Sequence, residues 1–198
     1  MTTNISNDER NLFDILRKDK LEDSRTFSKS SNRGLWKTII EQYPESAHFI
    51  YELLQNANDA KATYVKIILS KKGIVFKHNG TIQFSITSLE AKPVGHINAI
   101  TSIGDSSKDG LNTIGKFGIG FKSVFTYTDT PEVYDDKFWF RIENYIVPTL
   151  LNDDHHLRED GETLFWLPFR ANEEEQSYKE IYKNFWKSEF TGMKLPDT

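Results

Sequence analysis

The sequence predicts an α+β fold, a two-layer α/β sandwich in which helices cover one face of a mixed, mostly antiparallel sheet. Three observations support this prediction: apolar residues at helical spacing come first along the chain, a hairpin pattern follows them, and only short turns join the strands. Short turns favour antiparallel pairing, whereas a doubly wound parallel sheet needs a crossover between its strands.

The chain has 198 residues, no cysteine and a formal net charge of -4. This length suits one core with appendages, so we expect an N-terminal extension over 1–33, a single domain over 34–170, and an amphipathic helix and tail over 171–198. The lack of cysteine excludes disulfides, thiolate zinc sites and cysteine nucleophiles. The slightly acidic balance does not indicate nucleic acid as a partner.

No targeting or membrane signal is visible in the sequence. The opening residues lack the basic start and apolar run of a secretory signal, and no stretch approaches the roughly 20 apolar residues of a membrane span. We therefore expect a cytoplasmic protein with no membrane partner.

The first elements are helical. An apolar cluster from Leu12 to Leu16 predicts a short amphipathic helix. A second helical pattern begins at Leu35 and is interrupted by Pro44, and a further helix begins near Ser46. The period then changes to that of a strand, so helices precede the sheet along the chain.

The hairpin is predicted by alternating apolar residues over 65–69 and 74–76 on either side of a Lys72-Gly73 turn. Beyond it, the pattern predicts a helix over 94–103, a loop over 104–112, a helix beginning within 118–125, and strands at 137–142 and 163–167. Apolar residues at i, i+3, i+4, i+7 and i+8 in the tail predict a one-sided helix that must bury that face; they are Tyr178, Ile181, Tyr182, Phe185 and Trp186.

The helix over 49–60 carries polar groups on one side. Glu52, Asn56 and Asp59 stand at i, i+4 and i+7, so they share a narrow stripe opposite an apolar side. Oxygen-bearing side chains are the ligands that magnesium prefers, and a carboxylate beside them can activate a water. Taken alone, such a stripe is more typical of a solvated helix face.

A glycine loop, Thr113-Ile-Gly-Lys-Phe-Gly-Ile-Gly120, precedes the expected helix at 118–125. Glycine allows close approach to a ligand, and free N–H groups at the start of a helix attract anions. Lys116 and Lys122 add positive charge. The spacing fits neither a dinucleotide fingerprint nor a Walker loop, and the alternative interpretation is a flexible turn before a helix.

Together these segments carry a resemblance to a known family. Glu52-Leu-Leu-Gln-Asn-Ala-Asn-Asp-Ala60 resembles the N box of the GHKL ATPase superfamily, and Gly115-Lys-Phe-Gly-Ile-Gly120 resembles its second glycine box. His78-Asn79-Gly80, a Ser-Ser-Lys and Gly-Phe-Lys-Ser-Val-Phe are similar to the sacsin-like branch. The resemblance covers roughly 35–170 and implies the Bergerat fold, whose ATP pocket is shared by gyrase, heat-shock chaperones, histidine kinases and MutL.

The resemblance implies a role for each matching residue. Glu52 resembles the general base for the attacking water, Asn56 the magnesium ligand, and Asp59 a residue that hydrogen-bonds to the nucleotide. Thr163 is similar to the threonine that holds the adenine edge through water. The lid hinge and phosphate cradle are implied for Gly115, Lys116, Phe117, Gly118 and Gly120.

One motif departs from the family pattern. The family has Asp-x-Gly where this chain has His78-Asn79-Gly80, and that aspartate accepts the adenine amino proton. A neutral histidine nitrogen or an asparagine carbonyl can accept the same proton without a charge. The alternative is that His78 merely ends a strand.

The resemblance implies a domain that binds ATP with Mg²⁺ and hydrolyses it to ADP and phosphate, with lid closure driving a conformational change. Turnover is expected to be slow in isolation, because a cation from a following domain often completes such sites. A nucleotide-dependent homodimer and a protein partner or further domain at the C-terminal helix are the partners to consider.

Two alternatives remain open at this point. The first is a non-hydrolysing, nucleotide-sensing interaction module of a larger sacsin-like protein. The second, a histidine kinase, is weaker because no dimerisation helix with a phosphoacceptor histidine precedes the N box. His155 and His156 beside two aspartates suggest metal less than a solvated loop.

Overall fold

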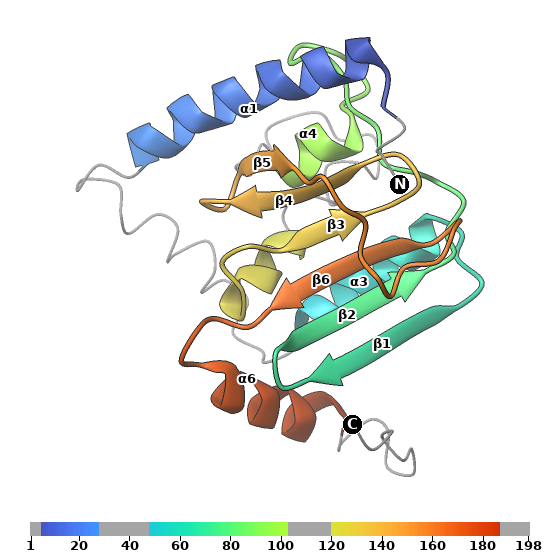
Figure 1. The fold of residues 1–198 in the computed structure, drawn as a ribbon, viewed down its shortest axis with the longest axis vertical. Helices are drawn as coiled ribbons and strands as arrows, with labels where there is room; N and C mark the ends of the chain where they lie inside the picture. The colour runs from blue at the N-terminus through green and yellow to red at the C-terminus, as the bar shows by residue number, and fades with distance from the viewer. Residues whose placement is uncertain (1–4, 28–47, 103–119, 187–198) are drawn as a thin grey trace.

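The computed structural model describes residues 5–27, 48–102 and 120–186, and these form an α+β architecture (Figure 1). One sheet has the strand order β1-β2-β6-β3-β4-β5, and each pairing within the described ranges is antiparallel. Those residues therefore hold an antiparallel sheet, without the parallel component of the predicted mixed one. The strands are β1 (Val65–Ser70), β2 (Gly73–His78), β3 (Glu132–Tyr134), β4 (Trp139–Glu143), β5 (Val147–Leu150) and β6 (Thr163–Pro168).

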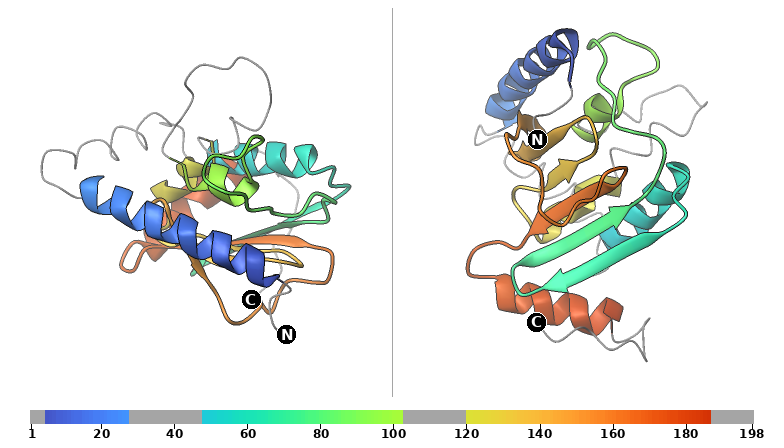
Figure 2. Two further views of the ribbon diagram at one scale, coloured as in Figure 1. Left: turned by 90° about the horizontal axis from the view of Figure 1, so that it is seen from above. Right: turned by 45° about the vertical axis from the view of Figure 1, so that its right-hand side comes forward.

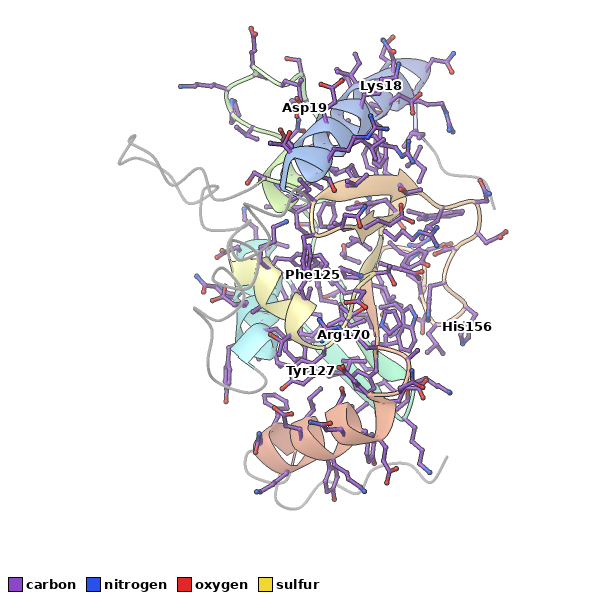
Figure 3. The ribbon with its side chains drawn as sticks, turned by 90° about the vertical axis from the view of Figure 1, so that its left-hand side faces the viewer. Lys18, Asp19, Phe125, Tyr127, His156 and Arg170 are labelled. Atoms are coloured by element: carbon purple, nitrogen blue, oxygen red, sulfur yellow. The ribbon has the colours of Figure 1, made fainter. Side chains whose placement is uncertain are left out.

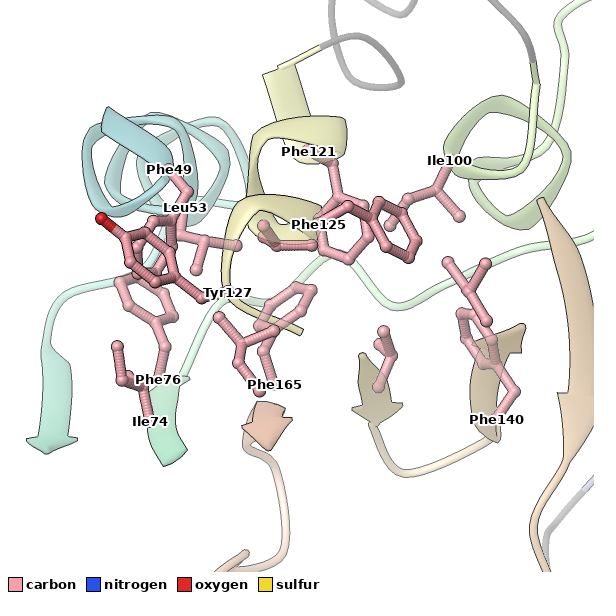
Figure 4. Packing of buried hydrophobic residues seen from close by; sticks show 14 of the residues in the cluster. Phe49, Leu53, Ile74, Phe76, Ile100, Phe121, Phe125, Tyr127, Phe140 and Phe165 are labelled. Atoms are coloured by element: carbon pink, nitrogen blue, oxygen red, sulfur yellow. The ribbon is translucent and has the colours of Figure 1, made fainter. Parts of the chain in front are cut away.

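The short helices α3 (His48–Asp59) and α4 (His96–Ile100) lie on the same side of the sheet (Figure 2). The 3₁₀ helix η2 (Lys122–Thr126) lies between them on that side (Figure 4). The long helix α1 (Asn7–Phe27) packs beside β5, and α6 (Glu174–Ile181) continues into the π-helical turn η3 (Tyr182–Trp186). No helix in the described ranges has the length and apolar character needed to cross a membrane.

The main core fills the space between these helices and the sheet (Figure 4). Side chains alternate along a strand, so Ile74 and Phe76 of β2 face the helices whereas Val75 and Lys77 face the other side. The helices contribute Phe49 and Leu53, among others, and each fully buried aromatic or leucine stabilises the fold by roughly 1.5–3 kcal/mol. The layer of helices is therefore held to the sheet by apolar contacts.

Arg170, just beyond β6, holds the carbonyl end of η2. Its guanidinium donates to the carbonyl oxygens of Phe125 at 2.5 Å and Thr126 at 2.7 Å, and its Nε donates to Asp129 at 2.7 Å. Figure 3 shows Arg170 beside Phe125 and Tyr127. Carbonyl groups at a helix end need such donors, so this contact fixes where η2 stops relative to the sheet.

The opposite face of the sheet carries a smaller apolar cluster of Val75, Tyr134, Trp139 and Leu164. The segment after β5 crosses this face and brings His156 to the side away from η2 (Figures 1 and 3). Both faces of the central strands are thus covered, one by helices and the other by a loop.

The predicted hairpin and the strand at 163–167 are confirmed as β1, β2 and β6. The strand predicted at 137–142 is also confirmed, as β4. Two strands, β3 and β5, were not predicted, because they are short and β5 contains Pro148 at the sheet edge, where a missing N–H is tolerated. Pairing with longer neighbours stabilises them.

The helices differ more from the sequence predictions. The N-terminal helix spans 21 residues, far beyond its apolar cluster, because Phe13 and Leu16 anchor it to the core while its other side is polar. The helix expected over 94–103 is limited to α4, and the Thr101 hydroxyl bonds back to the Ile97 carbonyl at its end. The helix expected from Leu35 and the loop at 104–112 lie outside the described residues.

Candidate functional site

Helix α3 presents the predicted polar stripe beside the sheet. Ile50, Leu53 and Ala57 are buried in the core, which turns the opposite side of the helix outward. Along that side, Asn56 is only 7% exposed, whereas Asp59 at the C-terminal end is exposed. The stripe therefore runs from a buried amide to a solvated carboxylate.

A cavity of about 340 Å³ lies against the end of this stripe. It is bounded by α3, by the adjoining ends of β2 and β6, and by the segment that leads into α4. Its lining consists of Asn56, Asp59, Ala60, His78, Ile82, Gln83, Phe84, His96, Thr163 and Phe165. Four of the predicted site residues, Asn56, Asp59, His78 and Thr163, are thus brought together.

Aromatic rings form much of the cavity wall. The Phe165 ring lies 6.2 Å from the Phe84 ring and 6.3 Å from the His78 ring, and Phe84 lies 6.1 Å from His96, each measured between centroids. An apolar, aromatic cavity with a few polar groups is typical of sites for flat, ring-containing ligands.

His78 and Thr163 are register partners on β2 and β6, and each is 3% exposed. Burial lowers the pKa of His78 to about 4, so its ring is neutral near pH 7. Its Nδ1 accepts a hydrogen bond from the Gly80 N–H at 3.0 Å. The proton of the neutral ring is therefore on Nε2, and His78 offers a hydrogen-bond donor to the cavity.

The other two residues of the motif, Asn79 and Gly80, have structural roles. The Asn79 Oδ1 accepts the N–H groups of Thr63 and Tyr64 at 3.0 and 3.1 Å, and its Nδ2 donates to the Thr63 hydroxyl at 2.8 Å. A Cβ on Gly80 would stand 2.7 Å from the Ala60 Cβ, so the strand end approaches α3 only with glycine there. In this structure, neither the Asn79 carbonyl nor the His78 Nδ1 is placed to accept a ligand proton.

The amide of Asn56 has an unusual environment. Its Nδ2 is buried and has no hydrogen-bond partner among the described residues. A buried amide that forms no hydrogen bond costs roughly 1–3 kcal/mol, and such groups are rare in proteins. Because Asn56 also lines the cavity, a ligand with oxygen atoms at this point would satisfy the amide.

Glu52, one turn before Asn56, lies outside the cavity lining and against Gly120. A Cβ on Gly120 would overlap the Glu52 carboxylate, so the missing side chain leaves the space that this carboxylate occupies. The Ser123 hydroxyl donates to the Gly120 carbonyl at 2.6 Å and fixes the backbone there. The start of the helix after the glycine loop is therefore in contact with the predicted base.

Lys122 does not reach the cavity. It is 3% exposed, and its ammonium donates to the carbonyls of Ile100 and Tyr145, both at 2.7 Å. Burial lowers the pKa of Lys122 to about 7. The predicted contribution of Lys122 to anion binding is therefore not supported by its position, because its donors join η2 to α4 and the β4–β5 turn instead. Four further predicted residues, Gly115, Lys116, Phe117 and Gly118, lie outside the described residues.

Sequence reasoning missed several lining residues. Phe165 stands two residues after Thr163 on the same strand, so the period of two could have placed both on one face. Phe84 comes from an irregular segment and His96 from the first position of α4, and no pattern in the sequence marked either as a lining residue. Their place depends on contacts that form only in the folded chain.

A second cavity, of about 460 Å³, lies on the opposite side of the sheet and includes Tyr134, Arg141, His155 and His156. The two histidine rings stack there with centroids 4.7 Å apart. Across the described ranges, no group of three or more His, Asp or Glu side chains is arranged to hold a metal ion. Asn56, Asp59, His78 and Thr163 line the first cavity and not this second one.

Comparison with known proteins gives three informative similarities. The chain is 34% identical over 171 residues to protein NO VEIN of Arabidopsis thaliana, a match covering 73% of this chain and 6% of that protein. It is 29% identical over 135 residues to human sacsin, covering 62% of this chain and 3% of sacsin. It is 26% identical over 193 residues to the chaperone protein HtpG of Bacillus velezensis, covering 81% of this chain and 30% of HtpG.

The chain thus spans less than a third of the length of each of these relatives. No family model matches the sequence. Similarity to sacsin and to a chaperone agrees with the sacsin-like and chaperone-like resemblance that the motifs carry, and it relates this chain to one portion of each of those larger proteins.

Proposed function

We propose that this chain binds ATP with magnesium in the cavity beside α3 and hydrolyses it to ADP and phosphate. The observation that carries the proposal is the buried, unpartnered amide of Asn56 at the wall of an aromatic cavity. The similarity to sacsin and HtpG and the motifs over 52–60 and 115–120 support the same assignment.

The lining divides into a ring-binding part and a phosphate-binding part. The base lies against the Phe84 and Phe165 rings, with its polar edge toward His78 and Thr163. The phosphates then extend toward α3, where the Asn56 amide can donate through Nδ2 and coordinate through Oδ1. Asp59, exposed at the rim, is available to a ribose hydroxyl or to water.

Magnesium, when bound, neutralises charge on the phosphates and polarises the bond that breaks. Asn56 supplies an oxygen ligand of the kind magnesium prefers. Glu52 orients a water and accepts its proton as the water oxygen attacks the γ-phosphate and the bond to the β-phosphate oxygen breaks. Glu52 reaches the water by moving from its contact with Gly120, so the position of Gly120 controls the step.

The competing function is a nucleotide-sensing module that binds without hydrolysis. The observation that favours it is the position of Glu52, which does not line the cavity in this conformation. In that case, nucleotide binding would change the conformation of the protein without phosphate release.

Phosphate release from ATP by the wild type and by Glu52→Ala separates the two functions. We expect measurable, magnesium-dependent release by the wild type, and loss of that release in Glu52→Ala while nucleotide binding by calorimetry is retained. Glu52→Gln is the matched variant, because it keeps the size of the side chain and removes the base. If the wild type and both variants release phosphate only at the background rate while nucleotide binding is intact, the chain is a nucleotide-sensing module and not an ATPase.

A further inference from the structure

Strand β1 forms an edge of the sheet that no other described strand covers. The strand order places β2 on one side of β1, and no backbone hydrogen bond among the described residues joins a loop to its other side (Figure 1). The opposite edge of the sheet is protected, because α1 packs beside β5 and Pro148 removes an N–H there. The open edge of β1 therefore offers backbone donors and acceptors to another extended chain.

The pairing register shows which backbone groups of β1 point outward. The Phe169 N–H, just beyond β6, donates to the Lys72 carbonyl at 2.9 Å, so position 72 bonds toward β6. Hydrogen bonding alternates from side to side along a strand, so Gly73 and every second residue after it bond toward β1. Gly73 pairs with Ser70, which means that Ser70 and every second residue before it bond inward. The other three positions direct their N–H and carbonyl groups to the open edge; they are Val65, Ile67 and Leu69.

The open edge is basic, although the chain as a whole is acidic. The segment 61–73 contains four lysines and no aspartate or glutamate, in a chain of net charge -4. Lys72 pairs with Glu174 on the surface, whereas Lys61 and Lys66 are exposed and have no ion-pair partner among the described residues. Charge at this edge therefore opposes another basic strand and favours an acidic one.

The two faces of β1 favour a partner with an alternating sequence. On the helix-covered face, Leu69 belongs to the main core, and Val65 and Ile67 pack against it. Lys66 points to the other face, because successive side chains of a strand alternate. A strand added beside β1 would continue the first face with apolar side chains and set acidic side chains beside Lys66.

We propose that the open edge of β1 binds an extended, acidic segment of a partner protein, which adds to the sheet as a further strand. The outward backbone groups pair with the segment, and its alternating acidic and apolar side chains select it. A second copy of this chain is a poor occupant, because it would bring two sets of lysines together. No residue of β1 lines the cavity beside α3, so this surface is distinct from the proposed nucleotide site.

Calorimetry with a synthetic peptide of alternating glutamate and valine, matched to β1 in length, tests the proposal on the whole chain. We expect binding at low salt, weaker binding as the salt concentration rises, and no binding of the corresponding lysine–valine peptide. The same acidic peptide N-methylated throughout keeps its charge but loses its backbone donors, so it should bind at least about tenfold more weakly. Absence of binding by the acidic peptide, or equal binding by its N-methylated form, would overturn the proposal.

Substitution of Ile67 tests the backbone pairing. Ile67→Pro removes one outward N–H and leaves the pairing with β2 in place, and proline is tolerated at such positions of an edge strand. We expect binding of the acidic peptide to weaken at least about tenfold. Ile67→Ala is the matched control, because it shortens the same side chain and keeps the N–H, so its affinity should stay within about threefold of the wild type. Equal affinities of the two variants would contradict pairing at this edge.

Reversal of charge at Lys66 tests the selection of acidic segments. Lys66→Glu should weaken binding of the acidic peptide about fivefold, because an attractive cross-strand pair becomes a repulsive one. Lys18→Glu is the control, since Lys18 is an exposed lysine on α1, beside the opposite edge of the sheet (Figure 3). An equal loss of affinity in both variants would mean that the peptide responds to net charge and not to β1.

Amide hydrogen exchange of the wild type, followed by NMR, gives a result that does not depend on a folded variant. We expect the amides of Val65 and Ile67 to exchange more slowly when the acidic peptide is bound, because they become donors to it. The amides of Lys66 and Ile68 already bond to β2 and should change little. Slower exchange elsewhere, with Val65 and Ile67 unaffected, would place the peptide on another surface and overturn the proposal.

Discussion

A buried ion pair on one face of the sheet and a buried amide on the other differ in whether the protein itself satisfies them. On the loop-covered face, the Lys77 ammonium and the Glu162 carboxylate, with side chains 5% and 3% exposed, pair at 2.7 Å. On the helix-covered face, the Asn56 amide is equally secluded and has no partner in the described chain. The two groups lie at neighbouring elements of one small domain.

The loop-covered face has a second saturated group. Arg158, 4% exposed, forms ion pairs with Asp154 at 2.6 Å and Asp136 at 2.7 Å. Buried charges that satisfy one another hold a loop in place, whereas a buried polar group without a partner destabilises the fold unless something else binds it. The Lys77–Glu162 pair and the Arg158 cluster are therefore structural, whereas the Asn56 amide, which also borders the first cavity, is a group that a bound ligand would satisfy.

The largest loss of stability is expected from breaking the buried Lys77–Glu162 ion pair. Lys77→Ala leaves the Glu162 carboxylate buried without its countercharge, and removal of one partner of such a pair costs about 3–5 kcal/mol. Urea unfolding followed by circular dichroism measures this loss. Lys72→Ala is the matched control, because Lys72 pairs with Glu174 on the surface, with side chains 76% and 37% exposed.

The double variant Lys77→Met with Glu162→Leu sharpens the result. Replacing both charges with apolar groups should recover most of the lost stability, since neither charge is then left alone. A Lys77→Ala variant as stable as Lys72→Ala would contradict the structural role of this face.

The next largest effect is expected on the pH dependence of stability, through the buried His78. The folded pKa of His78, about 4, lies below its unfolded value of 6.5, so the unfolded chain binds a proton first as the pH falls. Stability contributed by neutral His78 is complete above pH 6.5 and falls by roughly 3 kcal/mol by pH 4. Unfolding free energies at pH 7 and pH 4.5 should differ less in His78→Gln than in the wild type. Identical pH dependence in both proteins would mean that His78 is not buried in its neutral form.

A somewhat smaller effect is expected on ligand binding at Asn56. Asn56→Ala removes an amide that has no protein partner, so the free energy of unfolding should change by less than about 1 kcal/mol. Binding of the magnesium nucleotide should weaken by roughly 1.5–3 kcal/mol, because a hydrogen bond to a charged group is lost. Calorimetry and thermal unfolding measure the two quantities on one sample. A large loss of stability with unchanged binding would reverse the interpretation of this side chain.

The smallest stability effect is expected at Gly120. In Gly120→Ala the new Cβ meets the Glu52 carboxylate, which is the end of a flexible side chain and can move away, so stability should change by no more than about 1 kcal/mol. Phosphate release should nevertheless rise, because hydrolysis requires Glu52 to leave this contact and the new Cβ displaces it. The variant should bind nucleotide as the wild type does, and unaltered phosphate release would show that the contact has no role in hydrolysis.

Local patterns were enough to predict the elements that carry the site. The Glu52, Asn56 and Asp59 stripe follows from helical spacing, and the β1–β2 hairpin follows from alternation around Gly73. Thr163 was found as the head of an apolar strand. These features depend on residues close together in the chain, where periodicity is informative.

Features set by distant contacts were not accessible to the sequence. The charge of Lys122 suggested an anion contact, but Ile100 and Tyr145 carbonyls reach it only in the folded chain. The sequence left open whether His78 or Asn79 meets a base, and only the bond from the Gly80 N–H fixes which His78 nitrogen bears the proton. Tertiary pairing likewise stabilises β3 and β5 against weak local preference.

The central claim is that the cavity beside α3, with the unpartnered Asn56 amide at its wall, binds a magnesium nucleotide. A crystal structure with a nonhydrolysable ATP analogue and magnesium tests it most directly. We predict the purine against the Phe84 and Phe165 rings, with a ring acceptor at the His78 Nε2, and the Asn56 amide in contact with the metal or the phosphates. A nucleotide bound elsewhere, or a cavity still empty at saturating concentration with Asn56 unpaired, would contradict the claim.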